Sequence, residues 1–250
     1  MLINLRTIHK PTSISEAVKL LRQTDVYPLY GGGAALIRAD DQKIEEAVDL
    51  SKVVSEQCRL ADEDMFLSGR ATLQQIAEYD PALGEFIAAD MPNTLRNAMT
   101  LGDLLLECPP NSLFLGLLYG LVARIDTPER GANDTIQLAQ WFTMSTAERR
   151  QHVILGVIIP DFPKTHWRFA YEKVARTPSD TAIVGAIGFV YDGEPDPGSY
   201  SVVIGAMGHP VRYQVGLKAE VSDYKGSAAY RTEMAKVLSE RALAKAAGRK

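Results

Sequence analysis

The chain has 250 residues, of which 46% are hydrophobic and 23% charged, and its formal net charge is −4 at pH 7. This length and balance indicate an ordinary globular protein with a substantial core, as one domain with subdomains or as two modest domains. The mildly acidic charge excludes the basic footprint of a nucleic-acid-binding protein.

Cysteines, histidines and apolar runs narrow the class further. Cys58 and Cys108 are the only cysteines, too few for a disulfide framework or a cysteine-ligated iron–sulfur cluster, and the four histidines lack metal-site spacing. The N-terminus has no signal-peptide pattern, and the longest apolar run, residues 113–123, is too short to span a bilayer. We therefore expect a cytoplasmic protein with no membrane insertion and no metal on this chain.

The first fifty-odd residues predict a small α/β unit. Residues 13–22 begin with a capping box at Ser13 and continue as an amphipathic helix. The run "VYPLY", residues 26–30, predicts a strand that leads into three consecutive glycines, and "AVDL", residues 47–50, predicts another strand.

A second unit begins near residue 56 and mixes helices with strands. Its glycine-containing stretch "TLGDL" is interpreted as a turn. The elements expected around it are a strand at 65–71, helices at 72–79, 81–90 and 113–123, and a strand at 152–160.

The last third changes character toward antiparallel β-structure. Runs of strand length occupy residues 166–175, 181–192 and 200–208, and the turn-rich "GEPDPGS" separates the second from the third. The chain closes with an amphipathic helix at 227–247. The fold class expected from the whole pattern is α+β.

The glycine run "YGGGAAL", residues 30–36, is the clearest local signal in the chain. No P-loop and no G-x-S-x-G elbow is present. The run resembles the start of a dinucleotide fingerprint, with Asp49 near the place of a ribose-binding acid, although Leu36 replaces the third glycine. A nicotinamide-dependent enzyme and a sharp turn without a ligand are therefore both alternatives.

A second loop, "PNTLRNAMTLGDLL" at residues 92–105, changes that weighing. Together with the glycine run it resembles the FAD-binding medium-subunit family of molybdenum hydroxylases, whose loops read roughly P-L-A-G-G-T-D-L and I-R-N-x-A-T-[VI]-G-G-N. Further segments resemble the family in order: "KPTSISEAVKLL", "AVDLSKV", "LSGRATLQQI", "GVIIP", "FAYEKVARTPSDTAIVGAIG" and "VSDYKGSAAYRTEMAKVLSERAL".

The resemblance implies an α+β fold of three parts and a role in electron transfer. Residues 1–55 and 56–165 would form two FAD-binding subdomains, and 166–250 a C-terminal antiparallel sheet with a helix. FAD would lie between the two subdomains. The chain would relay electrons from a 2Fe–2S small subunit, beside a molybdopterin-binding large subunit, to an external acceptor, and would need no catalytic residue of its own.

The family's cofactor positions carry over to two loops and one lysine. In the family, glycine amides of both loops face the pyrophosphate, because backbone without a side chain forms a nest for oxyanions. The corresponding positions are Leu29, Tyr30, Gly31, Gly32, Gly33, Ala34, Ala35 and Leu36 in the first loop, Thr100, Gly102 and Asp103 in the second, and Lys173 in the F-x-K segment. Tyr30 replaces a small residue and would stack on a ring or occupy its space.

The second loop departs from the family pattern. Asp103 and Leu104 replace a glycine and an asparagine, and "ECPPNS" lacks the family's serine and aspartate. A carboxylate about 4 Å from a phosphate costs about 4 kcal/mol at an effective dielectric near 20, unless it turns into solvent. The alternative function is therefore a degenerate member that has lost FAD and serves as an assembly or interaction subunit.

Overall fold

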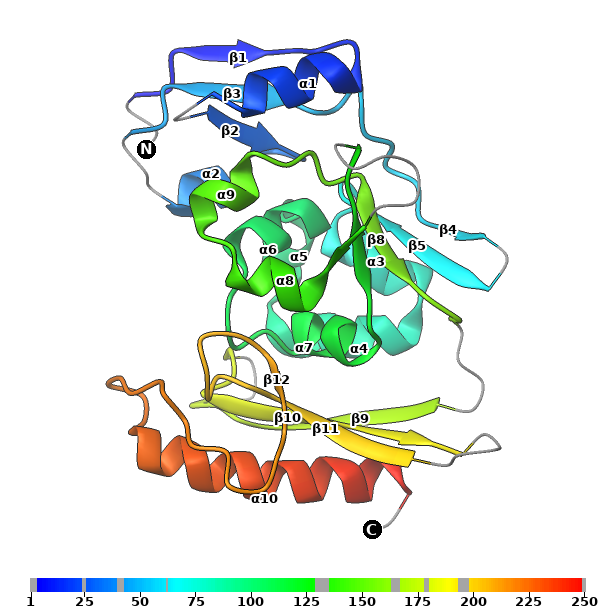
Figure 1. The fold of residues 1–250 in the computed structure, drawn as a ribbon, viewed down its shortest axis with the longest axis vertical. Helices are drawn as coiled ribbons and strands as arrows, with labels where there is room; N and C mark the ends of the chain where they lie inside the picture. The colour runs from blue at the N-terminus through cyan, green and yellow to red at the C-terminus, as the bar shows by residue number, and fades with distance from the viewer. Residues whose placement is uncertain are drawn as a thin grey trace. The chain divides into compact units, whose positions relative to one another are not determined.

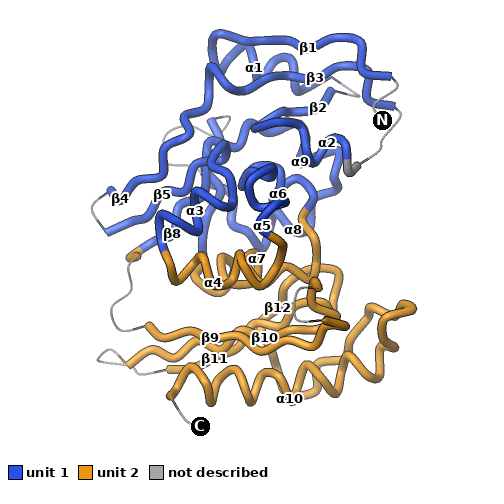
Figure 2. Tube along the Cα trace, turned by 180° about the vertical axis from the view of Figure 1, so that it is seen from behind, with its two compact units in different colours: residues 1–80, 93–107, 123–160 blue, residues 81–92, 108–122, 161–250 orange. Residues whose placement is uncertain are grey.

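The computed structural model shows two compact units, which Figure 2 separates by colour. The described residues are 4–23, 26–39, 43–61, 63–128, 135–162, 167–177, 180–192 and 198–248. Unit 1 consists of residues 1–80, 93–107 and 123–160, and unit 2 of residues 81–92, 108–122 and 161–250. These units group elements by contact, and the three-part division at residues 55 and 165 stays a prediction.

Unit 1 begins with a small parallel sheet in the order β1-β3-β2. Its strands are β1 (Thr7–His9), β2 (Val26–Leu29) and β3 (Glu46–Asp49), and β3 pairs in parallel with both neighbours. The parallel pairing of β2 and β3 requires a crossover, and α2 (Ala34–Ala39) lies in that connection, as Figure 1 shows. The glycine run is the turn between β2 and α2.

The other sheet of unit 1 is antiparallel, in the order β4-β5-β8-β6-β7. Its strands are β4 (Arg59–Ala61), β5 (Asp64–Ser68), β6 (Arg124–Asp126), β7 (Ile136–Gln137) and β8 (Gly156–Ile159). The two central strands, β5 and β8, are the apolar runs that the sequence predicts as strands, and their side chains are mostly buried.

Short helices complete unit 1. They are α1 (Ile14–Leu21), α3 (Leu73–Tyr79), α5 (Asn93–Ala98), α6 (Leu101–Glu107), α8 (Leu138–Thr143) and α9 (Thr146–Arg150). The Ser13 hydroxyl caps α1 by accepting from the Glu16 N–H, and Thr72 and Gln75 form a reciprocal capping box at α3. Both caps are local signals, which is why the sequence predicts these two starts.

Unit 2 is an antiparallel sheet, in the order β12-β11-β10-β9, with helices. Its elements are α4 (Pro81–Asp90), α7 (Leu113–Gly120), β9 (Trp167–Val174), β10 (Val184–Tyr191), β11 (Gly198–Ile204), β12 (Val211–Arg212) and α10 (Ala228–Ala246). The central strand β10 is buried along most of its length because Ala186 packs toward α10 while Ile187 and Phe189 contact glycines of α7.

A buried carboxylate joins the two short helices of unit 2. Asp90, at the end of α4, accepts hydrogen bonds from the Ser112 hydroxyl at 2.6 Å and from the N–H groups of Leu113 and Phe114 at 2.7 and 2.9 Å. These donors lie at the start of α7, so the carboxylate caps that helix. Burial raises the pKa of Asp90 to about 6, although the three donors act in the opposite direction.

The α+β class expected from the sequence is therefore confirmed, and one local interpretation is wrong. The "TLGDL" stretch is the first turn of α6 rather than a loop turn, because Thr100 caps a helix there. The short elements β1, β4, β6, β7, β12, α5, α8 and α9 lie outside the predicted set. Residues 193–197 of the expected turn and His166 of the expected strand lie outside the described residues.

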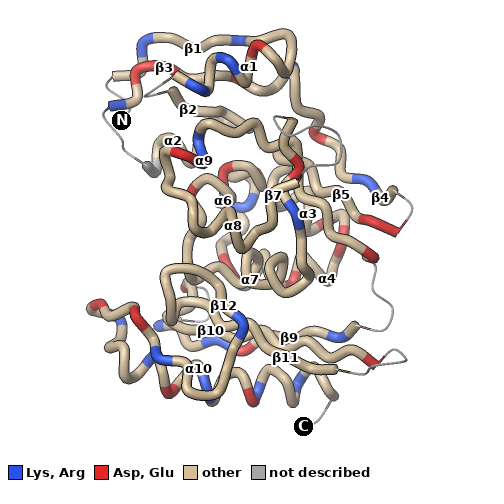
Figure 3. Tube along the Cα trace, viewed as in Figure 1, with Lys and Arg blue, Asp and Glu red and all other residues tan. Residues whose placement is uncertain are grey.

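The distribution of charged and apolar residues along the described chain bears on two features, a charged helix face and a membrane-spanning helix. Figure 3 shows basic and acidic positions interspersed along α10, as the alternation of Arg231, Glu233, Lys236 and Glu240 requires. None of the helices in the described residues combines the length and the apolarity needed to cross a bilayer.

Candidate functional site

A pocket of about 410 Å³ lies in unit 1 beside the glycine run. This volume is within the range of small-molecule sites. Its lining residues come from the first loop, the segment before β4, the start of α3 and the α5–α6 junction: Tyr30, Gly31, Gly32, Ala34, Ile37, Glu56, Arg70, Thr72, Gln75, Asn97, Ala98 and Thr100. The two loops singled out in the sequence therefore meet at one pocket.

The first loop presents bare backbone to this pocket. Gly31 and Gly32 are exposed, and in the described part of the chain none of the N–H groups from Gly31 to Gly33 donates to another group. A Cβ at Gly32 would meet nothing within 4 Å, whereas one at Gly31 would lie 2.7 Å from Cγ2 of Thr100. Gly33 has φ of 78°, which favours glycine, and its carbonyl accepts the first bond of α2. The loop thus offers amides suited to an oxyanion.

Tyr30 is turned into the protein rather than toward a ligand. Its side chain is almost completely buried, and its hydroxyl accepts from the Ile154 N–H at 2.7 Å and donates to the His152 carbonyl at 3.3 Å. A Cβ at Gly102 would lie 2.6 Å from Cδ2 of the ring. Gly102 is therefore a glycine because the Tyr30 ring packs on it, and the two expectations for Tyr30 toward a cofactor ring stay predictions.

The second loop uses its amides internally. Each N–H from Thr100 to Leu104 has an acceptor within unit 1: the Asp103 carboxylate at 3.1 Å for Thr100, the Ala71 carbonyl at 3.0 Å for Leu101, the Gly69 carbonyl at 2.8 Å for Gly102, the Thr100 hydroxyl at 3.2 Å for Asp103, and the Thr100 carbonyl at 3.1 Å for Leu104. The second loop therefore has no free amide among these positions, in contrast to the first.

Asp103 is buried at the start of α6 and does not turn into solvent. It is 1% exposed, is absent from the pocket lining, and forms a reciprocal cap with Thr100 at the start of α6. Its second oxygen, Oδ1, is buried without a partner in the described structure. Burial raises the pKa of this carboxyl, while the hydrogen bonds from Thr100 lower it. The carboxylate does not turn into solvent, and its Oδ2 lies 4.0 Å from the place of a Cβ at Gly31, so its repulsion of a bound phosphate stays a prediction.

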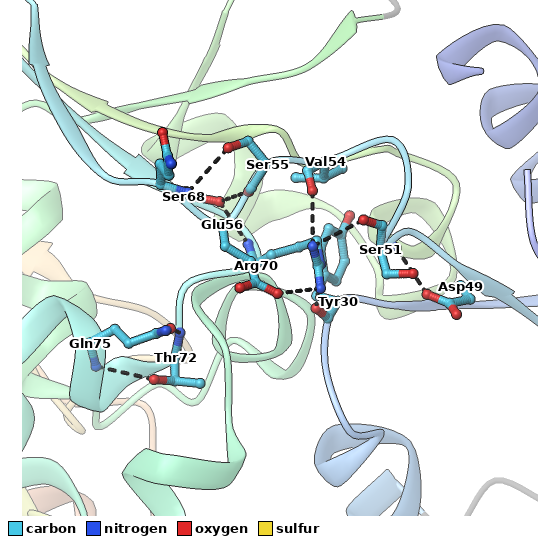
Figure 4. A network of polar contacts seen from close by, with 11 residues as sticks. Tyr30, Asp49, Ser51, Val54, Ser55, Glu56, Ser68, Arg70, Thr72 and Gln75 are labelled. Atoms are coloured by element: carbon cyan, nitrogen blue, oxygen red, sulfur yellow. Dashed lines mark hydrogen bonds and ion pairs between the residues drawn. The ribbon is translucent and has the colours of Figure 1, made fainter. Parts of the chain in front are cut away.

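Arg70 is one of the lining residues that the sequence reasoning missed, together with Ile37, Glu56, Thr72, Gln75, Asn97 and Ala98. Its guanidinium donates to the carbonyls of Tyr30, Ser51 and Val54 at 3.2, 3.1 and 3.2 Å, and to Oε1 of Glu56 at 2.5 Å. Figure 4 shows it at the centre of this network. Because these partners lie 14 to 40 residues away, no local pattern in the sequence indicates the contacts.

The remaining lining residues have local roles as well. Thr72 and Gln75 hold the capping box of α3 beside the pocket, and the Asn97 side chain donates to the Asn93 carbonyl within α5. Ile37 adds an exposed apolar side chain from α2. The pocket therefore combines apolar, amide and hydroxyl groups with one ion pair.

Only part of the predicted cofactor set lines the pocket. The lining members are Tyr30, Gly31, Gly32, Ala34 and Thr100, and those outside the lining are Leu29, Gly33, Ala35, Leu36, Gly102 and Asp103. Lys173 belongs to unit 2, where its ammonium donates to the carbonyls of Ala89 at 2.7 Å and Asp180 at 2.8 Å. The cofactor contacts of all these residues stay predictions.

Asp49 and the possible metal ligands lie as follows in the described residues. Asp49, the acid expected at a nicotinamide ribose, accepts from the Ser51 N–H at 2.9 Å and is absent from the pocket lining. Among the described residues, no group of three histidine, cysteine or acidic side chains is placed to hold a metal ion.

Comparison with known proteins points to one family. Residues 4–162 match the family model described as the FAD binding domain in molybdopterin dehydrogenase. The sequence has no match among curated proteins.

Solved structures give the same fold over the whole length. A chain of carbon monoxide dehydrogenase from Hydrogenophaga pseudoflava, lacking the Mo-pyranopterin moiety, is 19% identical with a TM-score of 0.81 over 99% of both chains. Reconstituted CO dehydrogenase from Oligotropha carboxidovorans has a chain that is 22% identical, with a TM-score of 0.81 over 100% of both. Quinoline 2-oxidoreductase from Pseudomonas putida 86 has one that is 18% identical, with a TM-score of 0.79 over 99% of this chain and 98% of that one. At this identity the likeness shows the fold.

Proposed function

Because this chain belongs to the family of FAD-binding domains in molybdopterin dehydrogenases, we propose that it binds FAD in the pocket of unit 1. The observation that carries the proposal is the row of amides from Gly31 to Gly33, which have no acceptor in the described part of the chain and lie at the family's first glycine loop. Amides of this kind bind phosphate oxygens without any side chain.

The first-loop amides would hold a phosphate group of FAD, with Thr100 opposite them as a wall of the pocket. Apolar contact would come from Ala34 and Ile37. FAD supplies the redox chemistry when bound, and the protein supplies position and electrostatics. No nucleophile or acid of this chain is needed, in agreement with the lack of a catalytic motif in the sequence.

We further propose that the chain is the flavoprotein subunit of a molybdenum-containing hydroxylase. It would receive electrons from a 2Fe–2S small subunit and pass them to an external acceptor, beside a molybdopterin-binding large subunit. The support is family membership together with the count of two cysteines, too few to ligate a cluster on this chain. A cytoplasmic location goes with this proposal.

A second candidate function rests on the second loop. Every amide from Thr100 to Leu104 is already bonded within the protein. Only the first loop is therefore left with amides that could bind a phosphate. A member of the family that has kept the scaffold and lost FAD, and that serves as an assembly or interaction subunit, would show this arrangement.

Titration of FAD into the purified chain, followed by calorimetry and by visible absorption, separates the two candidates. Binding in the micromolar range or tighter, with flavin bands retained after gel filtration, is the result expected of a flavoprotein subunit. A chain that stays colourless after reconstitution would refute it and favour the second candidate. Titration of NADH in parallel tests the nicotinamide alternative, which predicts saturable NADH binding without FAD binding.

A further inference from the structure

Arg70 differs from the other polar residues of the pocket in how completely it is engaged. Its side chain is 14% exposed, and it joins the first loop to the segment between β3 and β4 through four hydrogen bonds. A guanidinium can bridge three carbonyls in this way because its donors form a rigid planar fork, which an ammonium lacks.

One of those bonds acts on the peptide that begins the glycine loop. Arg70 Nε donates to the Tyr30 carbonyl at 3.2 Å, and the N–H at the other end of the same peptide unit is that of Gly31, which has no acceptor in the described part of the chain. A charged donor on the carbonyl polarises the peptide and strengthens its N–H as a donor. Gly31 lines the pocket, so the strengthened N–H belongs to the cradle.

Glu56 limits the charge of this arrangement. Its Oε1 lies 2.5 Å from Nη2 of Arg70, its side chain is 54% exposed, and it lines the same pocket. A carboxylate at the wall both neutralises the guanidinium and repels an anionic ligand.

We propose that Arg70 is a positioning residue for the cofactor's phosphate, which it serves by fixing and polarising the Tyr30–Gly31 peptide, and that Glu56 weakens phosphate binding through the same ion pair. This inference rests on the proposed binding of FAD. Arg70 and Glu56, which lie outside both glycine loops, would thus set how strongly the first loop binds an anion.

The test compares FAD with riboflavin, which carries no phosphate, on the purified full chain. Arg70→Lys keeps the positive charge but cannot bind the three carbonyls, and its FAD affinity should fall about tenfold. Glu56→Gln keeps an oxygen for Nη2 and removes the charge, and its FAD affinity should rise about threefold. Riboflavin affinity should change in neither variant, whereas a merely structural loosening of the pocket would move both ligands together.

Glu45→Gln is the matched control, because Glu45 also pairs with an arginine, Arg6, and is 53% exposed, but does not line the pocket. Its FAD affinity should equal that of the wild type. Equal affinities in wild type, Arg70→Lys and Glu56→Gln would overturn the inference and leave FAD binding intact. A wild-type chain that binds neither flavin would overturn the proposed function and this inference with it. If Arg70→Lys does not fold, the direction of the Glu56→Gln effect decides alone, and a fall in FAD affinity there contradicts the proposal.

Discussion

The two loops that meet at the pocket look alike in sequence and differ in structure. Both place glycine beside Ala or Leu near the start of a helix, but the first run precedes α2 whereas Gly102 lies in the first turn of α6. In the first, the amides from Gly31 to Gly33 have no acceptor in the described chain. In the second, every amide from Thr100 to Leu104 is bonded within the protein.

The difference separates two reasons for a glycine. Gly32 stands in open space, where a side chain would enter the proposed phosphate site, whereas Gly102 is needed because the Tyr30 ring lies against it. A glycine motif therefore indicates close approach to the backbone, and only the structure says whether the approaching group is a ligand or a neighbouring side chain.

Among the substitutions that test the difference between the two loops, Gly102→Ala should have the largest effect. Its new Cβ would lie 2.6 Å from Cδ2 of Tyr30, a ring held at its other end by two hydrogen bonds, so the ring cannot simply move aside. We expect a loss of about 3 kcal/mol in the free energy of unfolding, measured by urea denaturation.

Gly32→Ala is the matched substitution in the first loop. Because its Cβ meets nothing within 4 Å, the unfolding free energy should stay within about 0.5 kcal/mol of the wild type. FAD affinity should fall about tenfold, since the methyl group enters the space of the phosphate. A variant pair with the opposite pattern would reverse the roles assigned to the two loops.

Tyr30→Phe tests whether Tyr30 serves the protein or the ligand. Loss of the hydroxyl leaves the Ile154 N–H without its acceptor in a buried position, and we expect about 2 kcal/mol of destabilisation. The ring remains on Gly102, so FAD affinity should be unchanged in titrations under native conditions. A large loss of FAD affinity in a stable variant would show direct contact between Tyr30 and the cofactor.

Asp103→Gly restores the residue that the family has at this position and tests whether the carboxylate limits FAD binding. It removes the Asp103 half of the reciprocal cap of α6 and adds a glycine inside the helix, which together should cost about 1.5 kcal/mol of stability. It frees the Thr100 N–H but leaves Leu101 and Gly102 bonded, so FAD affinity should rise by no more than about threefold. A gain of several decades would mean that the carboxylate itself had been the obstacle.

The smallest effects expected are on the pH dependence of stability, to which Asp103 and Asp49 should contribute with opposite sign. Burial raises the pKa of Asp103, so the folded state holds its proton more tightly than the unfolded state, and this contribution to stability is lost as pH rises. For Asp49, at the end of β3, burial acts to raise the pKa, but the hydrogen bonds from Ser51 and the charges of Lys10 and Arg70 together outweigh it, and the pKa is lowered. Its contribution is lost as pH falls.

Asp103→Asn and Asp49→Asn isolate these contributions. Unfolding free energies measured between about pH 2 and pH 7 should show the wild type gaining on Asp103→Asn as pH falls, and losing on Asp49→Asn below about pH 4. Differences of the same sign in both variants would contradict the two environments described here.

How much the sequence predicts depends on how local each contact is. The helix starts at Ser13 and Thr72 follow from residues three positions apart, and the sequence predicts both. The amides of Leu101 and Gly102 depend on carbonyls some thirty residues earlier, and the Tyr30 hydroxyl bonds to the backbone of residue 154. The family resemblance brought the two loops together, but the orientation of Tyr30 and the burial of Asp103 required the tertiary structure.

The most direct test is hydrogen exchange at the amides of the two loops, measured with and without FAD. Bonded amides exchange slowly and free ones quickly. We predict that the amides of Gly31 to Gly33 exchange fast in the free chain and become protected by FAD, while those of Leu101 and Gly102 are slow in both states. Protection gained at Leu101 and Gly102, with none at the first loop, would contradict a phosphate cradle formed by the first loop alone.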